Sequence, residues 1–147
     1  SFLVKAINLQ KGLKFEMKIT TGIDIIEVDR IRKTVEELGD AFLNRIYTKK
    51  EIEYCNKGEA VKFQHLAARF AAKEAVFKAV SSYIDGRNDV LWKEIEILNL
   101  ESGKPEINVE RIAENIKKTA NKKLIDIDIS ISHIKDYAVA SVVAVLE

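Results

Sequence analysis

The pattern of hydrophobic and polar positions predicts most of the strands of this chain. Isoleucines and threonines make up most of "KITTGIDII" at about residues 18–26, and apolar residues alternate strictly with polar ones in "LIDIDISISH" at 124–133. This alternation is typical of a strand. It places four isoleucines on one face: Ile125, Ile127, Ile129 and Ile131. The run "YAVASVVAVL" at 137–146 is apolar almost throughout, which predicts a strand covered on both faces.

Other segments have the spacing of helices. "EVDRIRKTVEELG" is apolar at three- and four-residue intervals and ends at Gly39. Thr48 and Glu51 form a capping-box pattern ahead of a short helix that closes at Gly58. A long apolar helix follows at about 62–83, and Asn108 is a candidate N-cap of an amphipathic helix.

Between the two last helices, "DGRND" indicates a break, "WKEIEILNL" a strand, and "ESGKPEI" a turn with a short extended piece. Strands and helices thus follow one another in mixed order. This order predicts an α+β domain in which a mainly antiparallel sheet packs on a long central helix.

Composition narrows the class of protein. The chain has 147 residues, of which 47% are hydrophobic and 32% are charged, and its net charge of +1 favours no polyanionic partner. Cys55 is the single cysteine, which excludes a disulfide framework. No apolar run approaches the roughly 20 residues of a membrane span, and we expect a cytoplasmic protein without a nucleic-acid or membrane partner. Met17 is the single methionine, so we expect an added or upstream extension at 1–16 and one domain at 17–147.

The long apolar helix carries an unusual set of charges. Between Leu66 and Val80 its charged residues are Arg69, Lys73, Glu74 and Lys78. A helix this apolar is surrounded by protein on most sides, and an ion held there without a partner costs several kcal/mol. The spacing fits a buried salt-bridge network and a ligand site equally well.

A second charge interrupts an apolar strand. Asp24 lies within "TGIDII", where an aspartate is costly unless it is paired or caps a helix. An Asp and a Glu on two rigid elements are typical ligands of Mg²⁺ that also holds substrate phosphates. Lysines beside them would then contact phosphate.

These motifs together resemble the holo-acyl-carrier-protein synthase family, the small 4′-phosphopantetheinyl transferases. The resemblance rests on "GIDI", on "RFAAKEAVFKA" some 45 residues later, and on "GKP" and "SISH…YAVASV" in the same order. It implies an enzyme of fatty-acid biosynthesis that transfers the 4′-phosphopantetheine arm of coenzyme A to a serine of apo acyl carrier protein. The reaction is magnesium-dependent and releases adenosine 3′,5′-bisphosphate.

The resemblance also implies roles for individual residues. Asp24 and Glu74 match the Mg²⁺ ligands, and Lys78 matches the lysine at the coenzyme A phosphates, so these three are the expected catalytic residues. The expected substrate-binding residues are Arg69, Lys73, Gly103, Lys104, Pro105 and His133. Either carboxylate or a metal-coordinated water would take the serine proton. Without this context, a lone histidine such as His133 is more often a surface or capping residue.

The family docks an acidic carrier protein on a basic first helix and is trimeric, with the active site shared between neighbouring subunits. The matching basic residues here are Arg30, Arg32, Lys33 and Arg45, although Glu36 and Glu37 lie on the same helix. Two other hypotheses remain at this point. One is a non-catalytic coenzyme A or nucleotide-binding module, and the other is a scaffold with a buried salt-bridge network.

Overall fold

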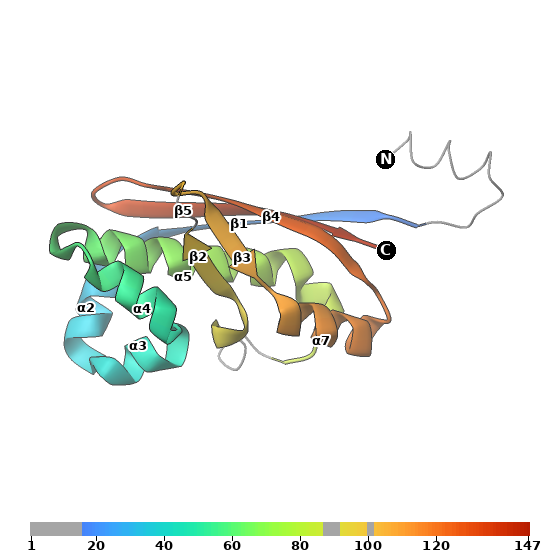
Figure 1. Ribbon diagram of the computed structural model, residues 1–147, viewed down its shortest axis with the longest axis horizontal. Helices are drawn as coiled ribbons and strands as arrows, with labels where there is room; N and C mark the ends of the chain where they lie inside the picture. Colours follow the sequence, from blue (N-terminus) through green and yellow to red (C-terminus); the bar gives the residue numbers. More distant parts are fainter. Residues whose placement is uncertain (1–15, 87–91, 100–101) are drawn as a thin grey trace.

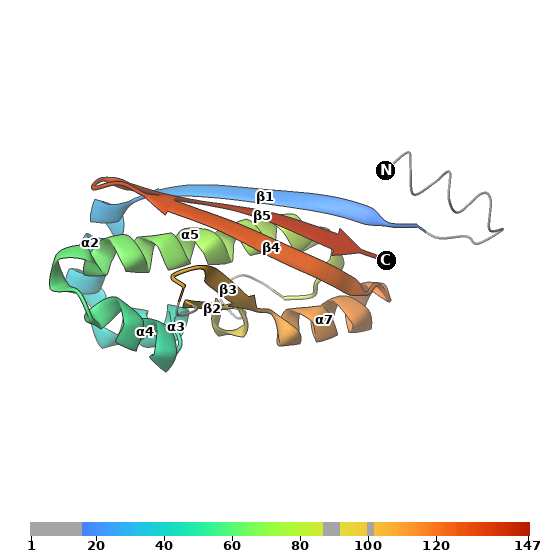
Figure 2. The same cartoon turned by 45° about the horizontal axis from the view of Figure 1, so that its top comes forward.

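A three-stranded sheet lies over one long helix in a computed structural model that describes residues 16–86, 92–99 and 102–147 (Figure 1). The sheet consists of β1 (Lys18–Glu27), β5 (Tyr137–Leu146) and β4 (Leu124–His133), in that spatial order and antiparallel throughout. β5 therefore lies between the other two strands (Figure 2). This confirms the predicted α+β architecture of a mainly antiparallel sheet on a long central helix.

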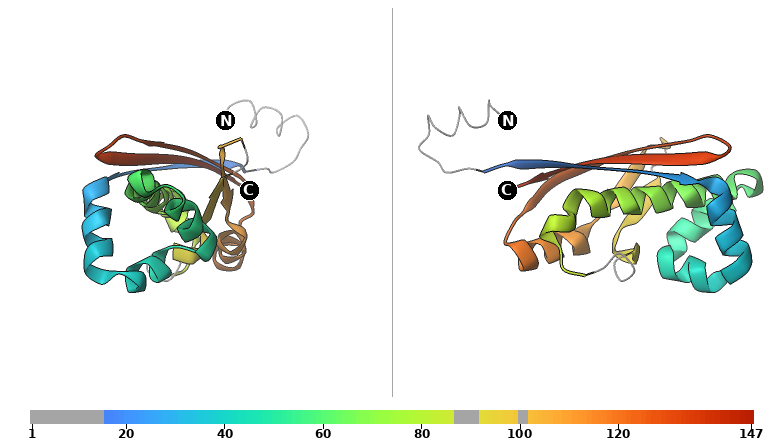
Figure 3. Two further views of the ribbon diagram at one scale, coloured as in Figure 1. Left: turned by 60° about the vertical axis from the view of Figure 1, so that its left-hand side comes forward. Right: turned by 180° about the vertical axis from the view of Figure 1, so that it is seen from behind.

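The central helix is α5 (Lys62–Val80), and twelve of its side chains are buried. Seen along α5, α2 lies on one side of the helix and α7 lies on the other (Figure 3). The smaller helices are α2 (Val28–Leu38), α3 (Asp40–Ile46), α4 (Lys49–Asn56) and α7 (Glu110–Ala120). β2 (Glu96–Asn99) and β3 (Pro105–Asn108) form a separate antiparallel pair. Single 3₁₀ turns are η1 (Glu59–Val61), η2 (Ser81–Tyr83) and η3 (Trp92–Glu94).

The sheet approaches α5 closely because both surfaces are made of small residues. α5 buries a series of alanines, among them Ala71, Ala75 and Ala79. Opposite them is Gly22 of β1, where an added Cβ would lie only 1.9 Å from the carbonyl oxygen of Ala75. The strand backbone thus rests directly on the helix backbone, and only glycine fits at this position.

The capping-box signal at the start of α4 is confirmed, whereas the candidate N-cap of α7 was wrong by one residue. Thr48 accepts a hydrogen bond from the Glu51 amide, and the Glu51 carboxylate accepts one from the Thr48 amide, which completes the predicted capping box. The Asn108 side chain accepts a hydrogen bond from the Glu110 amide at 3.2 Å, one residue ahead of the observed N-cap.

Two strand predictions were wrong in detail, and one helix was missed. A register shift between Leu124 and Asp126 removes Ile125 from the inward face of β4 and leaves it 38% exposed. β5 is not covered on both faces in the single chain, because its residues alternate between buried and exposed positions. Helix α3 was not predicted, since its seven residues are too few for a clear helical period.

Some predictions fall on residues outside the described ranges. The expected extension at 1–16 lies there except for its last residue, and so does most of the predicted break "DGRND". Among the described helices, none is long and apolar enough to cross a membrane.

The contact at Gly22 generates a stability prediction. We expect Gly22→Ala to lower the free energy of unfolding by about 3 kcal/mol, because the new methyl group would press against backbone that cannot move aside. Lys18→Ala, at an exposed position of the same strand, is the control. Urea denaturation measures both, and an unchanged midpoint for Gly22→Ala would contradict the close contact.

Candidate active site

The charged residues of the apolar helix α5 differ in how deeply they are buried. Arg69 and Lys73 are buried, Glu74 is half-buried, and Lys78 is exposed. A helix turns by about 100° per residue, so neighbours such as Lys73 and Glu74 face different parts of the molecule. These four charges of α5 therefore lie in different environments and do not form one network.

Lys73 forms the buried ion pair. Its ammonium group donates to Glu51 Oε1 at 2.8 Å, to the carbonyl oxygen of Trp92 at 2.9 Å, and to that of Ile95. Glu51 Oε2 in turn accepts from the Ile97 amide at 3.3 Å. Both side chains of the pair are fully shielded from solvent. Burial lowers the pKa of Lys73, and the Glu51 carboxylate opposes that shift.

This position differs from the substrate contact that the resemblance implied for Lys73. A lysine has three donors, and the three acceptors above occupy all of them. Lys73 therefore fastens α5 to α4, to η3 and to the residue that precedes β2, and it has no donor left for a substrate in this arrangement.

Asp24 and Lys78 form the second ion pair. Lys78 Nζ lies 3.0 Å from Asp24 Oδ1 and also donates to the Ile23 carbonyl oxygen at 2.9 Å. The Asp24 side chain is 17% exposed and that of Lys78 is 52% exposed. The strand aspartate thus has a partner, but the pair lies at the rim of the core where a ligand can reach it.

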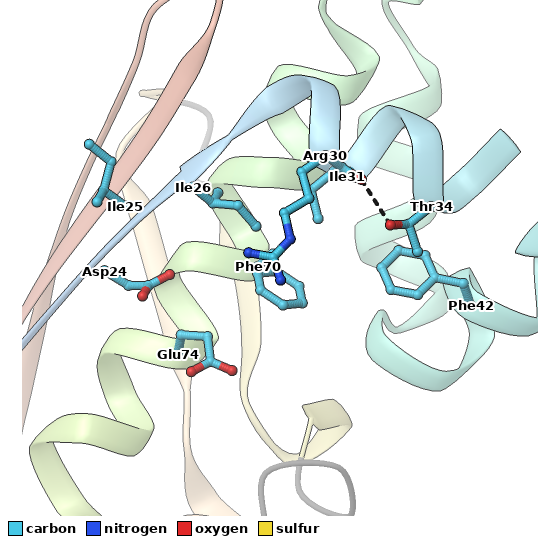
Figure 4. Close-up of a pocket in the computed structure, with 9 residues that line it drawn as sticks. All are labelled: Asp24, Ile25, Ile26, Arg30, Ile31, Thr34, Phe42, Phe70 and Glu74. Atoms are coloured by element: carbon cyan, nitrogen blue, oxygen red, sulfur yellow. Dashed lines mark hydrogen bonds between the residues drawn. The ribbon is translucent and has the colours of Figure 1, made fainter. Parts of the chain in front are cut away.

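Asp24 and Glu74 line one cavity of about 430 Å³. Both carboxylates point into the same space, and the guanidinium of Arg30 faces it from α2 (Figure 4). The apolar part of the wall includes Phe42 and Phe70. β1 and α5, which pack against each other, thus bring two negative side chains together, and α2 adds one positive side chain.

The two carboxylates suit a hard divalent cation. Mg²⁺ prefers oxygen ligands and usually binds through one or two carboxylates together with waters and substrate phosphates. Within the described residues, no group of three or more His, Cys, Asp or Glu side chains could hold a metal ion. Two carboxylates would leave the other coordination positions of such an ion to waters and to a phosphate.

A second cluster of polar side chains lies nearer the N-terminal end of α5. Buried Arg69 donates to the side-chain oxygen of Asn99, whose amide group donates to the Gly103 carbonyl oxygen at 3.3 Å. One turn before Arg69, the His65 ring lies 5.6 Å from the His133 ring. The structure therefore links three of the predicted substrate-binding residues through Asn99 and His65. Next to them, Lys104 is exposed and Pro105 begins β3.

The predicted docking residues lie mostly on α2. Arg32 and Lys33 both contact Asp29 at 3.0 Å. Lys33, and then Arg32, lower the pKa of the Asp29 carboxyl. Asp29 therefore neutralises part of the positive charge that Arg32 and Lys33 give to this surface. Arg45 belongs to the last turn of α3.

Sequence reasoning missed three contributors to these clusters. Glu51 was identified only as a capping residue, because its contact with Lys73 joins positions 22 residues apart. Asn99 and His65 carried no motif, and their proximity to Arg69 and His133 depends on the fold. Cys55 is buried, as expected of an isolated cysteine, and burial raises its thiol pKa to about 11.

Known sequences match this chain over most of its length. The sequence model of the 4′-phosphopantetheinyl transferase superfamily matches residues 20–142. A holo-[acyl-carrier-protein] synthase of Ruminiclostridium cellulolyticum is 44% identical over 124 residues, which cover 84% of this chain and 90% of the relative. One from Solibacter usitatus is 40% identical over 127 residues, which cover 86% and 98%.

Solved structures agree with the sequences. The holo-[acyl-carrier-protein] synthase of Neisseria meningitidis has a TM-score of 0.70 and 31% identity, with 85% of this chain and 96% of that one covered. The Bacillus anthracis enzyme, solved in complex with CoA (3′,5′-ADP), has a TM-score of 0.68 and 34% identity, with 88% and 97% covered.

The fold and the site thus define a member of the 4′-phosphopantetheinyl transferase superfamily, to which this chain belongs. Within the superfamily it falls among the holo-[acyl-carrier-protein] synthases, because its curated relatives carry that name and match over nearly their whole length.

The buried pair generates a second stability prediction. We expect Lys73→Met to cost about 3–5 kcal/mol, because it leaves the Glu51 carboxylate buried without its counter-charge. The double variant Lys73→Met/Glu51→Gln should lose less than the two single variants together, since no buried charge remains.

Lys78→Met on the same helix is the matched control, and we expect it to cost under about 1 kcal/mol because Lys78 is exposed. Urea denaturation of all four variants measures these values. Strictly additive losses would show that the two buried charges do not depend on each other.

Proposed function

We propose that this protein transfers the 4′-phosphopantetheine group of coenzyme A to a serine of apo acyl carrier protein. The reaction depends on Mg²⁺, releases adenosine 3′,5′-bisphosphate and takes place in the cytoplasm. The observation that carries this proposal is the pair of carboxylates, Asp24 and Glu74, that face one cavity beside the Lys78 ammonium group. The relatives named holo-[acyl-carrier-protein] synthase support the same conclusion.

The residues of the cavity suit attack on a pyrophosphate. Asp24 and Glu74 would hold Mg²⁺ from two rigid elements, and the bound ion supplies positive charge that offsets the charge of the phosphates. The serine hydroxyl gives its proton to one of the two carboxylates or to a water, its Oγ forms a bond with the β-phosphorus, and the bond from that phosphorus to the bridging oxygen breaks. Lys78 lies 3.0 Å from Asp24. It is therefore placed to neutralise the phosphate that leaves as part of adenosine 3′,5′-bisphosphate.

The second cluster is suited to the nucleotide end of coenzyme A. Arg69 and His133 would contact the adenosine and its 3′-phosphate, and the turn at Gly103, Lys104 and Pro105 would lie at the adenine. In support, Asn99 holds the Arg69 guanidinium on one side and the Gly103 carbonyl on the other. The solved complex of the Bacillus anthracis enzyme with CoA (3′,5′-ADP) is consistent with such a ligand.

An acidic carrier protein would dock beside this cavity. Arg30 is the docking residue that lines the cavity itself, so it is placed between the carrier surface and the reacting groups. Arg32, Lys33 and Arg45 would add positive charge around it. Because Asp29 pairs with both Arg32 and Lys33, we expect these two to steer the carrier less strongly than Arg30 does.

The exposed face of the sheet supports the proposed homotrimer. On the face opposite α5, Ile19, Ile23 and Ile25 of β1 are 55%, 63% and 66% exposed, and Val143 of β5 is 45% exposed. An apolar surface of this kind is typical of a protein interface. Two further copies of the chain would cover it, which accounts for the apolar character of both faces of β5.

Transfer is tested by incubation with coenzyme A, Mg²⁺ and apo acyl carrier protein, followed by mass spectrometry of the carrier. We expect the carrier to gain one phosphopantetheine group. Asp24→Asn or Glu74→Gln should slow the reaction by roughly a hundredfold to a thousandfold, because each removes charge that acts on the transition state. Removal of the metal by EDTA should have at least as large an effect.

Asp85→Asn, which removes an exposed carboxylate at the far end of α5, is the control and should react at the normal rate. If coenzyme A binds but no carrier is modified, the protein is a binding module rather than a transferase. If neither carboxylate variant slows the reaction, the site is not at this cavity.

The trimer is tested by light scattering during size-exclusion chromatography. We expect a mass of three chains for the natural sequence and of one chain for Ile23→Glu, which places a charge in the apolar face. Ile134→Glu changes an equally exposed isoleucine in the turn between β4 and β5, and it should remain trimeric. A monomeric natural protein that still modifies its carrier would overturn the shared-site trimer.

A further inference from the structure

His65, which no sequence motif pointed to, lies in a cluster of rings and cations. Its ring centroid is 5.3 Å from that of Tyr54 on α4 and 5.6 Å from that of His133 at the end of β4. The guanidinium carbon of Arg69 lies 4.3 Å from the centroid of the Tyr54 ring. The consecutive helices α4 and α5 therefore converge at this point with β4, which is distant in sequence.

Two polar atoms of this cluster lack a partner. Across the described residues, three buried side-chain nitrogen or oxygen atoms make no hydrogen bond, and two of them are His65 Nδ1 and Arg69 Nε. These residues are four apart on α5, so their side chains lie on the same face, one turn apart. A buried donor or acceptor left unpaired is destabilising, because it has lost its contacts with water and gained none in return. Their coincidence at one place points to a polar ligand that supplies the missing contacts.

The charges around His65 favour an anionic ligand. The groups that face the ring are Tyr54 from α4, Arg69 from its own helix and His133 from β4, and none of them is a carboxylate. Burial, then Arg69, then His133 lower the pKa of His65. The imidazole is consequently neutral at pH 7 in the free protein. A dianionic group placed beside it would reverse this effect, because a nearby negative charge raises the pKa of a histidine.

We propose that His65 is a specificity residue of the nucleotide end, which takes up a proton from solvent when a phosphate monoester binds beside Arg69 and His133. The inference rests on the proposed function, since that function brings the 3′-phosphate of coenzyme A to this cluster. The bound state then contains a protonated His65 next to the phosphate. No bond to the phosphate is formed or broken.

The affinity for coenzyme A should depend on pH. The form of the protein that carries the extra proton binds the dianion more tightly, so affinity for coenzyme A falls as the pH rises from 6 to 8. Below about pH 6 the monoester itself takes up a proton, which limits the gain. A rise of one unit in the pKa of His65 corresponds to about a tenfold difference in affinity between its two protonation states.

His65 acts on binding and not on the chemical step. It lies nine residues from Glu74 on the same helix, which is about 13 Å at 1.5 Å per residue. Its substitution should therefore change the KM for coenzyme A while kcat at saturating coenzyme A stays the same.

Titration calorimetry of the full chain at fixed Mg²⁺ tests the proposal. Coenzyme A and 3′-dephospho-coenzyme A are compared from pH 6 to pH 8, in pairs of buffers with different heats of ionisation that report proton uptake. For the natural sequence we expect proton uptake and about tenfold weaker binding at pH 8 with coenzyme A. The dephospho form, which lacks the monoester, should show neither.

The decisive variant is His65→Phe, which keeps a ring against Tyr54 and His133 but cannot take up a proton. We expect its pH dependence to fall to about threefold or less, with reduced proton uptake. His65→Gln should behave in the same way. Agreement between two side chains of different shape would show that the lost proton site, and not a packing defect, causes the change. The matched control is Lys62→Gln, three residues away, which removes a cation that does not titrate in this range and should leave the pH dependence of binding unchanged.

Equal proton uptake and equal pH dependence in the natural protein and in both His65 variants would overturn the inference, and so would the same pH dependence with the dephospho form. If carrier modification proceeds normally in that case, the proposed function still stands. If coenzyme A does not bind to the natural protein at any pH, both the inference and the proposed function fail.

Discussion

The close contact between β1 and α5 is the constraint on which the rest of the structure depends. Gly22 lets the strand backbone rest on the helix backbone at Ala75, and Asp24 follows two residues later on the same side of the strand. Glu74 directly precedes Ala75 along the helix. The contact that fixes the sheet on the helix therefore also fixes the separation of the two carboxylates, so that packing and chemistry are determined together.

The charges of α5 are separated by depth in the molecule. Lys73 is completely shielded and is neutralised by Glu51, whereas Asp24 and Lys78 meet at the rim, where water and a ligand can reach them. Desolvation explains this division, because a buried ion is tolerated only with a full set of partners. A rim position lets an ion exchange one partner for another. Adjacent residues of one helix can therefore serve stability and function separately.

The sequence predicted the layers of the fold because hydrophobic periodicity and capping residues act locally. Thr48 and Glu51 were sufficient to locate the start of α4, and the strict alternation in 124–133 was sufficient to locate β4. Asp24 and Glu74 were predicted as site residues from a charge within an apolar strand or helix and from a family resemblance. The sequence could not reveal the contact between Glu51 and Lys73, or that between His65 and His133. Those contacts depend on how the elements pack across long separations in the chain.

The double use of Glu51 has a consequence for the cooperativity of unfolding. One carboxylate both caps α4 and neutralises Lys73, with Oε1 shared between the Thr48 amide and the lysine. If the first turn of α4 opened alone, the buried ammonium would lose its counter-charge and part of the core would be disrupted. An eight-residue helix at the periphery would ordinarily fray with little cost. Here its opening is coupled to the global transition, so its amide hydrogens should exchange with solvent as slowly as those of the long helix.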